Sequence, residues 1–210
     1  MKINLFANDI PATLNLEGDL ALDTEAMGLA IARDRLCLVQ ISTGNQEVYL
    51  VQFDNNYEAP NLKRLLSDTK TTKIFHFARF DLAVIKHYLG ITIENVFCTQ
   101  IASRIARTYT ESHGLKDLCR ELLQEHISKE QQSSDWGKNP LSREQQHYAA
   151  SDVLHLHKLR IILTEMLERE SRIDLANKIF AFLNTRVELD LLGWNNVDIF
   201  AHTGIKKSAL

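Results

Sequence analysis

The sequence predicts a single α/β domain in which a mixed central sheet is flanked by helices. Strand-like apolar runs occupy the first half of the chain, and helical apolar spacing occupies the second half. This order is typical of helices that pack on a sheet. The length of 210 residues suits one domain of ordinary size with a sizeable core.

Three apolar runs in the first half predict strands. They cover residues 20–23, 36–42 and 48–51, and the polar residues 43–46 between the last two predict a hairpin turn. The run 36–42 is almost continuously apolar, as expected for a central strand that is covered on both faces.

Leucine and isoleucine spacing predicts the helices of the second half. One helix starts near Phe80 and can be closed by Gly90, and another covers residues 115–122. The clearest helix starts at Ser142, because Ser142 and Gln145 have the spacing of a capping box, and it continues toward residue 168. We assign residues 1–185 to the domain and residues 186–210 to a C-terminal tail for packing or oligomer contacts.

Composition bounds the function. The chain has 45% hydrophobic and 24% charged residues and a net charge of −3, which is typical of a soluble globular protein. This balance argues against a surface that holds long nucleic acid, because such a surface needs many Lys and Arg residues. A nuclease for short substrates remains compatible, since metal ions can supply positive charge locally.

Cysteine usage and the N-terminal sequence predict a cytoplasmic protein. Cys37, Cys98 and Cys119 are far apart and form no CxxC pair, so reduced buried thiols are expected. Asn8 and Asp9 interrupt any apolar signal-peptide core, and no run of 18 apolar residues exists. We therefore expect no membrane association.

Three acidic motifs stand out, beginning with Asp23 and Glu25 at the end of the first predicted strand. Side chains at i and i+2 of a strand point to the same face, so these two carboxylates can share a divalent cation. A solvated turn is the equal alternative for this pair alone. Asp81 lies in a strongly apolar stretch, where an unpaired carboxylate is costly; the alternative is an ordinary helix N-terminal aspartate.

The third motif is Tyr148 and Asp152. At i and i+4 of a helix the two side chains share one face, and small residues lie between them. The alternative is an amphipathic helix with a surface aspartate.

Together the motifs predict a metal site. Two like charges about 4 Å apart cost about 4 kcal/mol at an effective dielectric near 20, so four clustered carboxylates need cations or protons. Two divalent cations would remove the repulsion and favour in-line phosphoryl displacement. Oxygen ligands alone favour Mg²⁺ or Mn²⁺.

The blocks at residues 22–25, 80–82 and 148–152 resemble, in this order, the DEDDy 3′→5′ exonucleases, the ribonuclease D-like branch of the DnaQ-like superfamily. The resemblance covers about residues 15–165 and implies a ribonuclease H-like fold. Residues 187–200 resemble the tail of nano-RNase C, a family of short stand-alone enzymes that degrade dinucleotides. That family forms octameric rings and has been linked to DNA cleavage, so a homo-oligomer is implied.

The resemblance also implies roles. Asp23, Glu25 and Asp152 would hold the metal that generates the nucleophile, and Asp23 with Asp81 would hold the second. Tyr148 would position the attacking water, and the product would be a 5′-mononucleotide.

Four further residues are proposed as substrate contacts: Thr24, Met27, Leu29 and His76. Leu29 follows Glu25 at the spacing where the related oligoribonuclease has a leucine that wedges between two bases. The alternative for Leu29 is a core leucine, and the alternative for His76 is a near-core histidine.

The predicted function is therefore a 3′→5′ exoribonuclease that degrades dinucleotides and very short RNA. A ribonuclease D-like exonuclease for longer RNA or DNA is the first alternative; the acidic balance and the lack of room for accessory domains disfavour it. An inactive nucleic-acid-binding scaffold is the second, and the five filled catalytic positions disfavour it.

Overall fold

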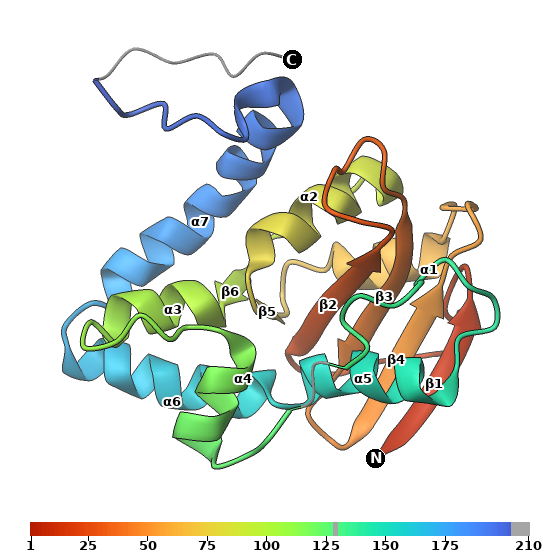
Figure 1. Ribbon diagram of the computed structural model, residues 1–210, viewed down its shortest axis with the longest axis horizontal. Helices are drawn as coiled ribbons and strands as arrows, with labels where there is room; N and C mark the ends of the chain where they lie inside the picture. The colour runs from red at the N-terminus through yellow and green to blue at the C-terminus, as the bar shows by residue number, and fades with distance from the viewer. Residues whose placement is uncertain (128–129, 203–210) are drawn as a thin grey trace.

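A mixed β-sheet forms the centre of the computed structural model, which describes residues 1–127 and 130–202 (Figure 1). Within these residues the sheet has six strands in the order β1-β4-β3-β2-β5-β6. Neighbours pair in parallel at both edges, and β3 pairs antiparallel with β2 and β4. The strands are β1 Lys2–Ala7, β2 Leu20–Ala26, β3 Leu36–Ser42, β4 Glu47–Gln52, β5 Lys73–Phe75 and β6 Val96–Cys98. The predicted mixed sheet in one α/β domain is confirmed.

Strand β3 is buried at every position, because it lies in the middle of the sheet with β2 and β4 on its two sides and helices over its faces. Its continuous apolar run predicted this. The hairpin between β3 and β4 is also confirmed. Three strands were not predicted, β1, β5 and β6, and the last two are only three residues long.

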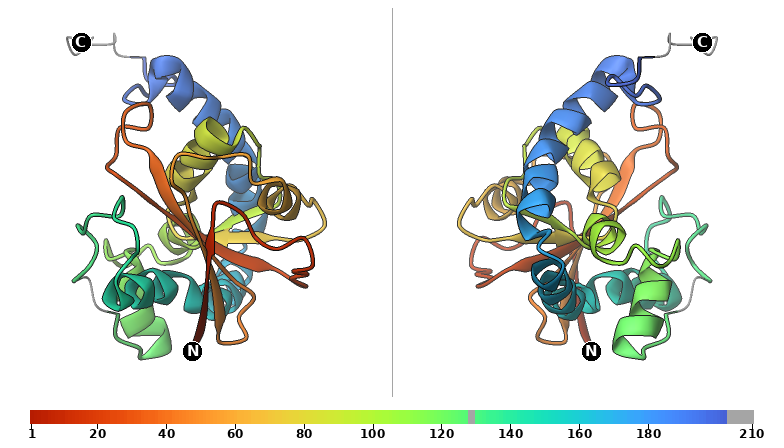
Figure 2. Two further views of the ribbon diagram at one scale, coloured as in Figure 1. Left: turned by 90° about the vertical axis from the view of Figure 1, so that its right-hand side faces the viewer. Right: turned by 90° about the vertical axis from the view of Figure 1, so that its left-hand side faces the viewer.

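Helices cover both faces of the sheet. Figure 2 shows α5 on one side and α1 on the opposite side. Helices α3, α6 and α7 pack together beyond the β5–β6 edge. The elements are α1 Pro60–Leu66, α2 Ala78–Leu89, α3 Thr99–Ala106, α4 Leu115–Leu118 with the π-helical turn η1 Cys119–Leu123, α5 Arg143–Leu154, α6 Leu156–Arg169, α7 Ile173–Leu189 and the π-helical turn η2 Asp190–Trp194.

Helix ends follow the predicted caps. Gly90 closes α2 in the left-handed conformation, with φ of 71°, which suits a residue without a Cβ. Ser142 and Gln145 form the predicted capping box: the Ser142 hydroxyl accepts from the Gln145 amide at 3.2 Å, and the Gln145 side chain accepts from the Ser142 amide at 3.0 Å.

The prediction of one long helix from Ser142 toward residue 168 is wrong. The chain forms two helices, α5 and α6, that meet at His155. Helix α5 packs on β2, β3 and β4, whereas α6 packs on α3 and β5. The chain must change direction between these two surfaces, and apolar periodicity continues across the break.

The C-terminal part is tied to α2. Asp190 accepts from Arg79 of α2, with Nε–Oδ2 at 2.5 Å, and from Arg186 of α7, with Nε–Oδ1 at 3.0 Å. The predicted domain limit at 185/186 falls inside α7, and residues 203–210 of the predicted tail lie outside the described residues. The domain limits stay a prediction. No helix among the described residues is long and apolar enough to cross a membrane.

Candidate active site

Strand β2 carries the first two carboxylates. Asp23 and Glu25 lie inside the strand, opposite Gln40 and Leu38 of β3, so the solvated-turn alternative for this pair is wrong. The alternation of a strand directs both side chains to one face, while Thr24 between them is buried.

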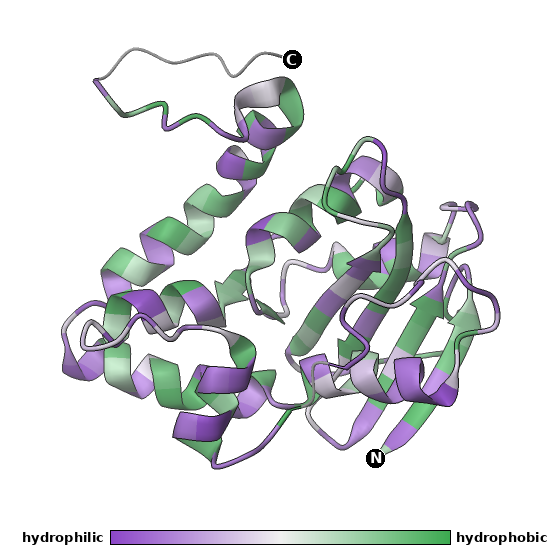
Figure 3. Cartoon of the chain, in the orientation of Figure 1, coloured by the Kyte–Doolittle hydropathy of each residue, from purple (hydrophilic) through white to green (hydrophobic). Residues whose placement is uncertain are grey.

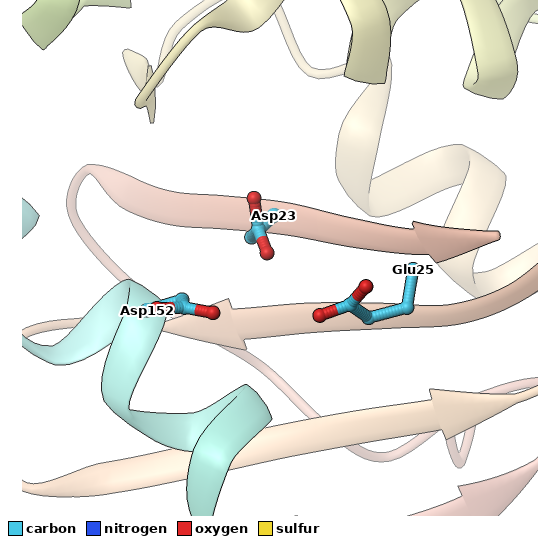
Figure 4. Close-up of side chains that lie close together, drawn as sticks. All are labelled: Asp23, Glu25 and Asp152. Carbon is cyan, nitrogen blue, oxygen red and sulfur yellow. The ribbon is translucent and has the colours of Figure 1, made fainter. Parts of the chain in front are cut away.

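Helix α5 brings the third carboxylate to the same face. Asp23, Glu25 and Asp152 each offer a carboxylate oxygen, and these three atoms lie within 4.8 Å of one another (Figure 4). This is possible because α5 lies directly across β2, β3 and β4. Tyr148 lies one turn earlier on α5 and lines the same cavity, so the predicted shared face of Tyr148 and Asp152 is observed.

Asp81 lies beside this group but outside the close trio. It sits in the first turn of α2 and is only 3% exposed. Its Oδ1 accepts a hydrogen bond of 2.6 Å from the Thr24 hydroxyl. Because Thr24 and Asp23 are sequential, this bond anchors α2 to β2 next to the cluster. The Asp81 charge also acts on Asp23 and Glu25.

Burial and mutual repulsion raise the pKa values of the acidic residues. Burial first, and then the charges of Asp81, Asp152 and Glu25, hold the pKa of Asp23 well above its usual range. Burial first, and then the charges of Asp152 and Asp81, raise the pKa of Glu25 to about 9. Burial raises the pKa of Asp81 to about 7, although the hydrogen bond from Thr24 opposes the shift. Burial and mutual repulsion destabilise the ionised form of these carboxylates. A bound cation would stabilise that form, so the cluster is suited to metal binding.

A cavity of about 310 Å³ opens over the acidic cluster. Most of the side chains that line it are polar or charged, and Leu115 and Ile127 supply its apolar part. The lining residues are Asp23, Thr24, Glu25, His76, Gly114, Leu115, Lys116, Ile127, Gln132, Tyr148 and Asp152.

The proposed substrate contacts differ in position. His76 lines the cavity, but its Nδ1 lies 2.9 Å from the Thr99 hydroxyl, and burial lowers its pKa to about 4. A His76 contact to substrate would therefore be made by a neutral ring. Met27 and Leu29 stand on the loop after β2 and are exposed, so the core alternative for Leu29 is wrong.

Sequence reasoning missed three polar side chains at the site, Gln40, Lys116 and Gln132. Gln40 donates to Asp23 Oδ2 at 3.3 Å; a polar residue inside the apolar run 36–42 was an available signal. Lys116 lines the cavity from the α4 region, and no local pattern marks it. Trp136 is buried beside the site, with its ring centroid 5.9 Å from that of Tyr148.

The raised pKa values predict how stability depends on pH in EDTA. The ordinary pKa of Glu25 is 4.5 and its folded value is about 9, and Asp81 moves from 3.8 to about 7. The folded state therefore binds more protons than the unfolded chain between about pH 4 and 9, so stability should fall as pH rises through this window. Thermal melts at pH 5, 7 and 9 measure this. Saturating Mg²⁺ should weaken the dependence, and a Tm that rises with pH in EDTA would contradict it.

Comparison with known proteins assigns the family. Residues 4–168 match the family described as 3′-5′ exonuclease, and the fold and the carboxylate cluster agree with that chemistry. The chain belongs to this family and is a 3′→5′ exonuclease of the DnaQ-like group. Among solved structures it is similar to NrnC of Brucella melitensis. The NrnC structure with bound Mg²⁺ is 51% identical with a TM-score of 0.92, and the one bound to pGG is 52% identical with a TM-score of 0.93. Both matches cover 97% of this chain and 100% of NrnC.

More distant relatives are ribonucleases D. The protein of Gluconacetobacter diazotrophicus is 35% identical over 161 residues, which cover 77% of this chain and 41% of the relative. The chain thus spans about two fifths of the curated relatives it matches. Ribonuclease D of Escherichia coli shares the fold, with a TM-score of 0.71 at 24% identity.

Proposed function

We propose that this exonuclease hydrolyses dinucleotides and very short oligoribonucleotides to 5′-mononucleotides at a two-metal site. The observation that carries the proposal is the Asp23–Glu25–Asp152 cluster at the floor of a cavity of about 310 Å³. The similarity to NrnC along its whole length, including a structure bound to pGG, supports a short substrate. The net charge of −3 also favours few phosphate contacts.

The donor set fits Mg²⁺ or Mn²⁺, because the clustered ligand atoms are all carboxylate oxygens. Asp23, Glu25 and Asp152 would hold one ion, and Asp23 with Asp81 would hold the second. When bound, the ions supply Lewis-acid activation of water and stabilise the leaving oxygen. The carboxylates would hold these ions at the cavity that receives the substrate.

Tyr148 is proposed to orient the attacking water. Burial first, and then the charges of Asp152, Glu25 and Asp23, raise the pKa of Tyr148. The hydroxyl therefore keeps its proton at neutral pH and acts through hydrogen bonding. Lys116, from the cavity wall, is placed to offset charge on the substrate phosphate.

A substrate series tests the proposed function. The protein is incubated with Mg²⁺ or Mn²⁺ and end-labelled RNA or DNA of two, seven and twenty nucleotides, and with EDTA as the metal-free arm. We expect the RNA dinucleotide to disappear fastest and EDTA to stop turnover. If the twenty-nucleotide substrates were degraded fastest while the dinucleotide persisted, the ribonuclease D-like alternative would hold instead. Asp23→Ala is the catalytic control.

We also propose that the chain forms a homo-oligomer, with the octameric ring as the expected form. The support lies in the C-terminal third, where Figure 3 shows apolar residues along α7, η2 and the following segment, and several of their side chains are exposed. They are Leu175, Phe182, Leu192, Trp194, Ile199 and Phe200. Exposed apolar side chains concentrated in one region are typical of an association surface. Light scattering on the purified protein measures the state, and a monomer at micromolar concentration would contradict the proposal.

A further inference from the structure

The loop between β2 and β3 holds an apolar side chain in solvent. Leu29 on this loop is 84% exposed. Because burial of apolar surface is favourable, a leucine on a pliable loop tends to fold back onto nearby apolar groups. The loop contains hydrogen bonds that can hold this side chain in solvent.

Asp34 makes these hydrogen bonds. Its side chain is only 9% exposed although it lies in a surface loop. Its Oδ2 accepts from the Ala30 amide at 2.9 Å, and its own amide donates to the Ala30 carbonyl at 2.7 Å. Arg33 completes the pairing, with Nε to Oδ1 at 2.7 Å and Nη2 to Oδ2 at 2.9 Å.

The same carboxylate also touches the residue on the other side of Leu29. Gly28 lies so close to Asp34 that a Cβ on Gly28 would come within 2.4 Å of Asp34 Oδ2. Gly28 and Ala30 are the two chain neighbours of Leu29, so Asp34 holds the backbone on both sides of the exposed side chain. A hydrogen bond of 2.8 Å from the Tyr88 hydroxyl to the Ile31 carbonyl ties the loop to α2.

We infer that Asp34 is a positioning residue that, together with the close approach of Gly28, fixes Leu29 so that it can insert between the two bases of a dinucleotide. The inference rests on the proposed function and on the proposed role of Leu29 in it. Arg33 first, and then the Ala30 amide, lower the pKa of Asp34 to about 2. The carboxylate is thus ionised at neutral pH and can accept these hydrogen bonds.

A double-variant cycle tests this inference. Asp34→Ala, Leu29→Ala and the double variant are assayed with pGG and Mn²⁺ for KM and kcat. We expect each single variant to raise KM about tenfold, with a smaller change in kcat, because positioning of the bases is lost. The double variant should have the KM of Leu29→Ala alone, since Asp34 acts only through Leu29.

A second pair of variants keeps the test informative if Asp34→Ala folds poorly. Gly28→Ala retains Asp34 but forces its carboxylate away, so it should also raise KM in the wild-type background and not in the Leu29→Ala background. Asp34→Asn keeps an oxygen for the Ala30 amide and should recover most of the wild-type KM.

Asp9→Ala is the matched structural control. Asp9 also ties a loop together, since it accepts from the amides of Ile10, Asn61 and Leu62. We expect it to lower Tm without a rise in KM. If Asp34→Ala lowered Tm with KM unaltered, or if its effect multiplied that of Leu29→Ala, the positioning role would be refuted. Failure of the wild-type protein to cleave pGG would instead refute the proposed function.

Discussion

Asp23→Asn is expected to lower kcat by about 10³–10⁴-fold and, in EDTA, to raise the Tm of the protein. Coordinated metal supplies several kcal/mol of transition-state stabilisation, and about 1.4 kcal/mol corresponds to a factor of ten. Asp23 lies in the trio with Glu25 and Asp152, so its replacement removes a ligand that both proposed metal sites share.

Stability in EDTA is expected to rise although kcat falls, because the carboxylates of the cluster repel one another without cations. An interaction between like charges about 4 Å apart costs about 4 kcal/mol at an effective dielectric near 20. The raised pKa of Asp23 means that protons already relieve part of this repulsion, so we expect a gain of about 1 kcal/mol, or roughly 2–4 °C in a domain of this size. The asparagine is isosteric and can still accept from Gln40, which now lies 3.3 Å from Asp23 Oδ2.

Asp19→Asn is the matched control for this experiment. Asp19 pairs with Arg160 and accepts from the Thr72 amide at 2.9 Å, and these partners lower its pKa although burial opposes the shift. The same substitution there removes an attraction, so it should lower Tm in EDTA and leave activity near wild type. A fall in Tm for both variants would show that the cluster around Asp23 is not repulsive.

Local sequence patterns predicted the elements that have a long apolar run or a capping motif. Strand β3 was readable because seven consecutive buried positions require an apolar run, and the start of α5 was readable because Ser142 and Gln145 satisfy each other. Strands β5 and β6 have three residues each, too few to show any period. They form because β5 pairs with β2 and β6 pairs with β5, which is a tertiary cause.

The acidic cluster was predictable for the same reason, and its surroundings were not. Strand alternation places Asp23 and Glu25 on one face of β2, and helical spacing places Tyr148 and Asp152 on one face of α5. Both results are independent of how the rest of the chain packs. The bond from Thr24 to Asp81 spans 57 positions, and it depends on how α2 packs against β2. The exposure of Leu29 also depends on tertiary contacts, because contacts within its loop determine it. Sequence spacing alone could not distinguish an exposed Leu29 from a core leucine.

Tyr148→Phe is expected to lower kcat about 10²–10³-fold while leaving Mn²⁺ affinity and the KM for pGG near wild type. Loss of a group that orients or transfers a proton typically costs about 10²–10⁴-fold. The phenyl ring can keep its place, because Tyr148 packs with its ring centroid 5.9 Å from that of Trp136. Steady-state kinetics at saturating pGG and a Mn²⁺ titration measure the two quantities.

Tyr57→Phe is the matched control, because the Tyr57 hydroxyl donates a hydrogen bond of 2.8 Å to the Leu36 carbonyl and Tyr57 is not among the residues that line the cavity. Tyr57→Phe should keep the wild-type kcat and lower the Tm slightly. The pH profile of Tyr148→Phe then separates two roles. Since burial and the neighbouring carboxylates raise the pKa of Tyr148, a residue that acts only by hydrogen bonding leaves the shape of the residual profile as it was. A change in the alkaline part of the profile in this variant would instead identify Tyr148 as a group that titrates during turnover.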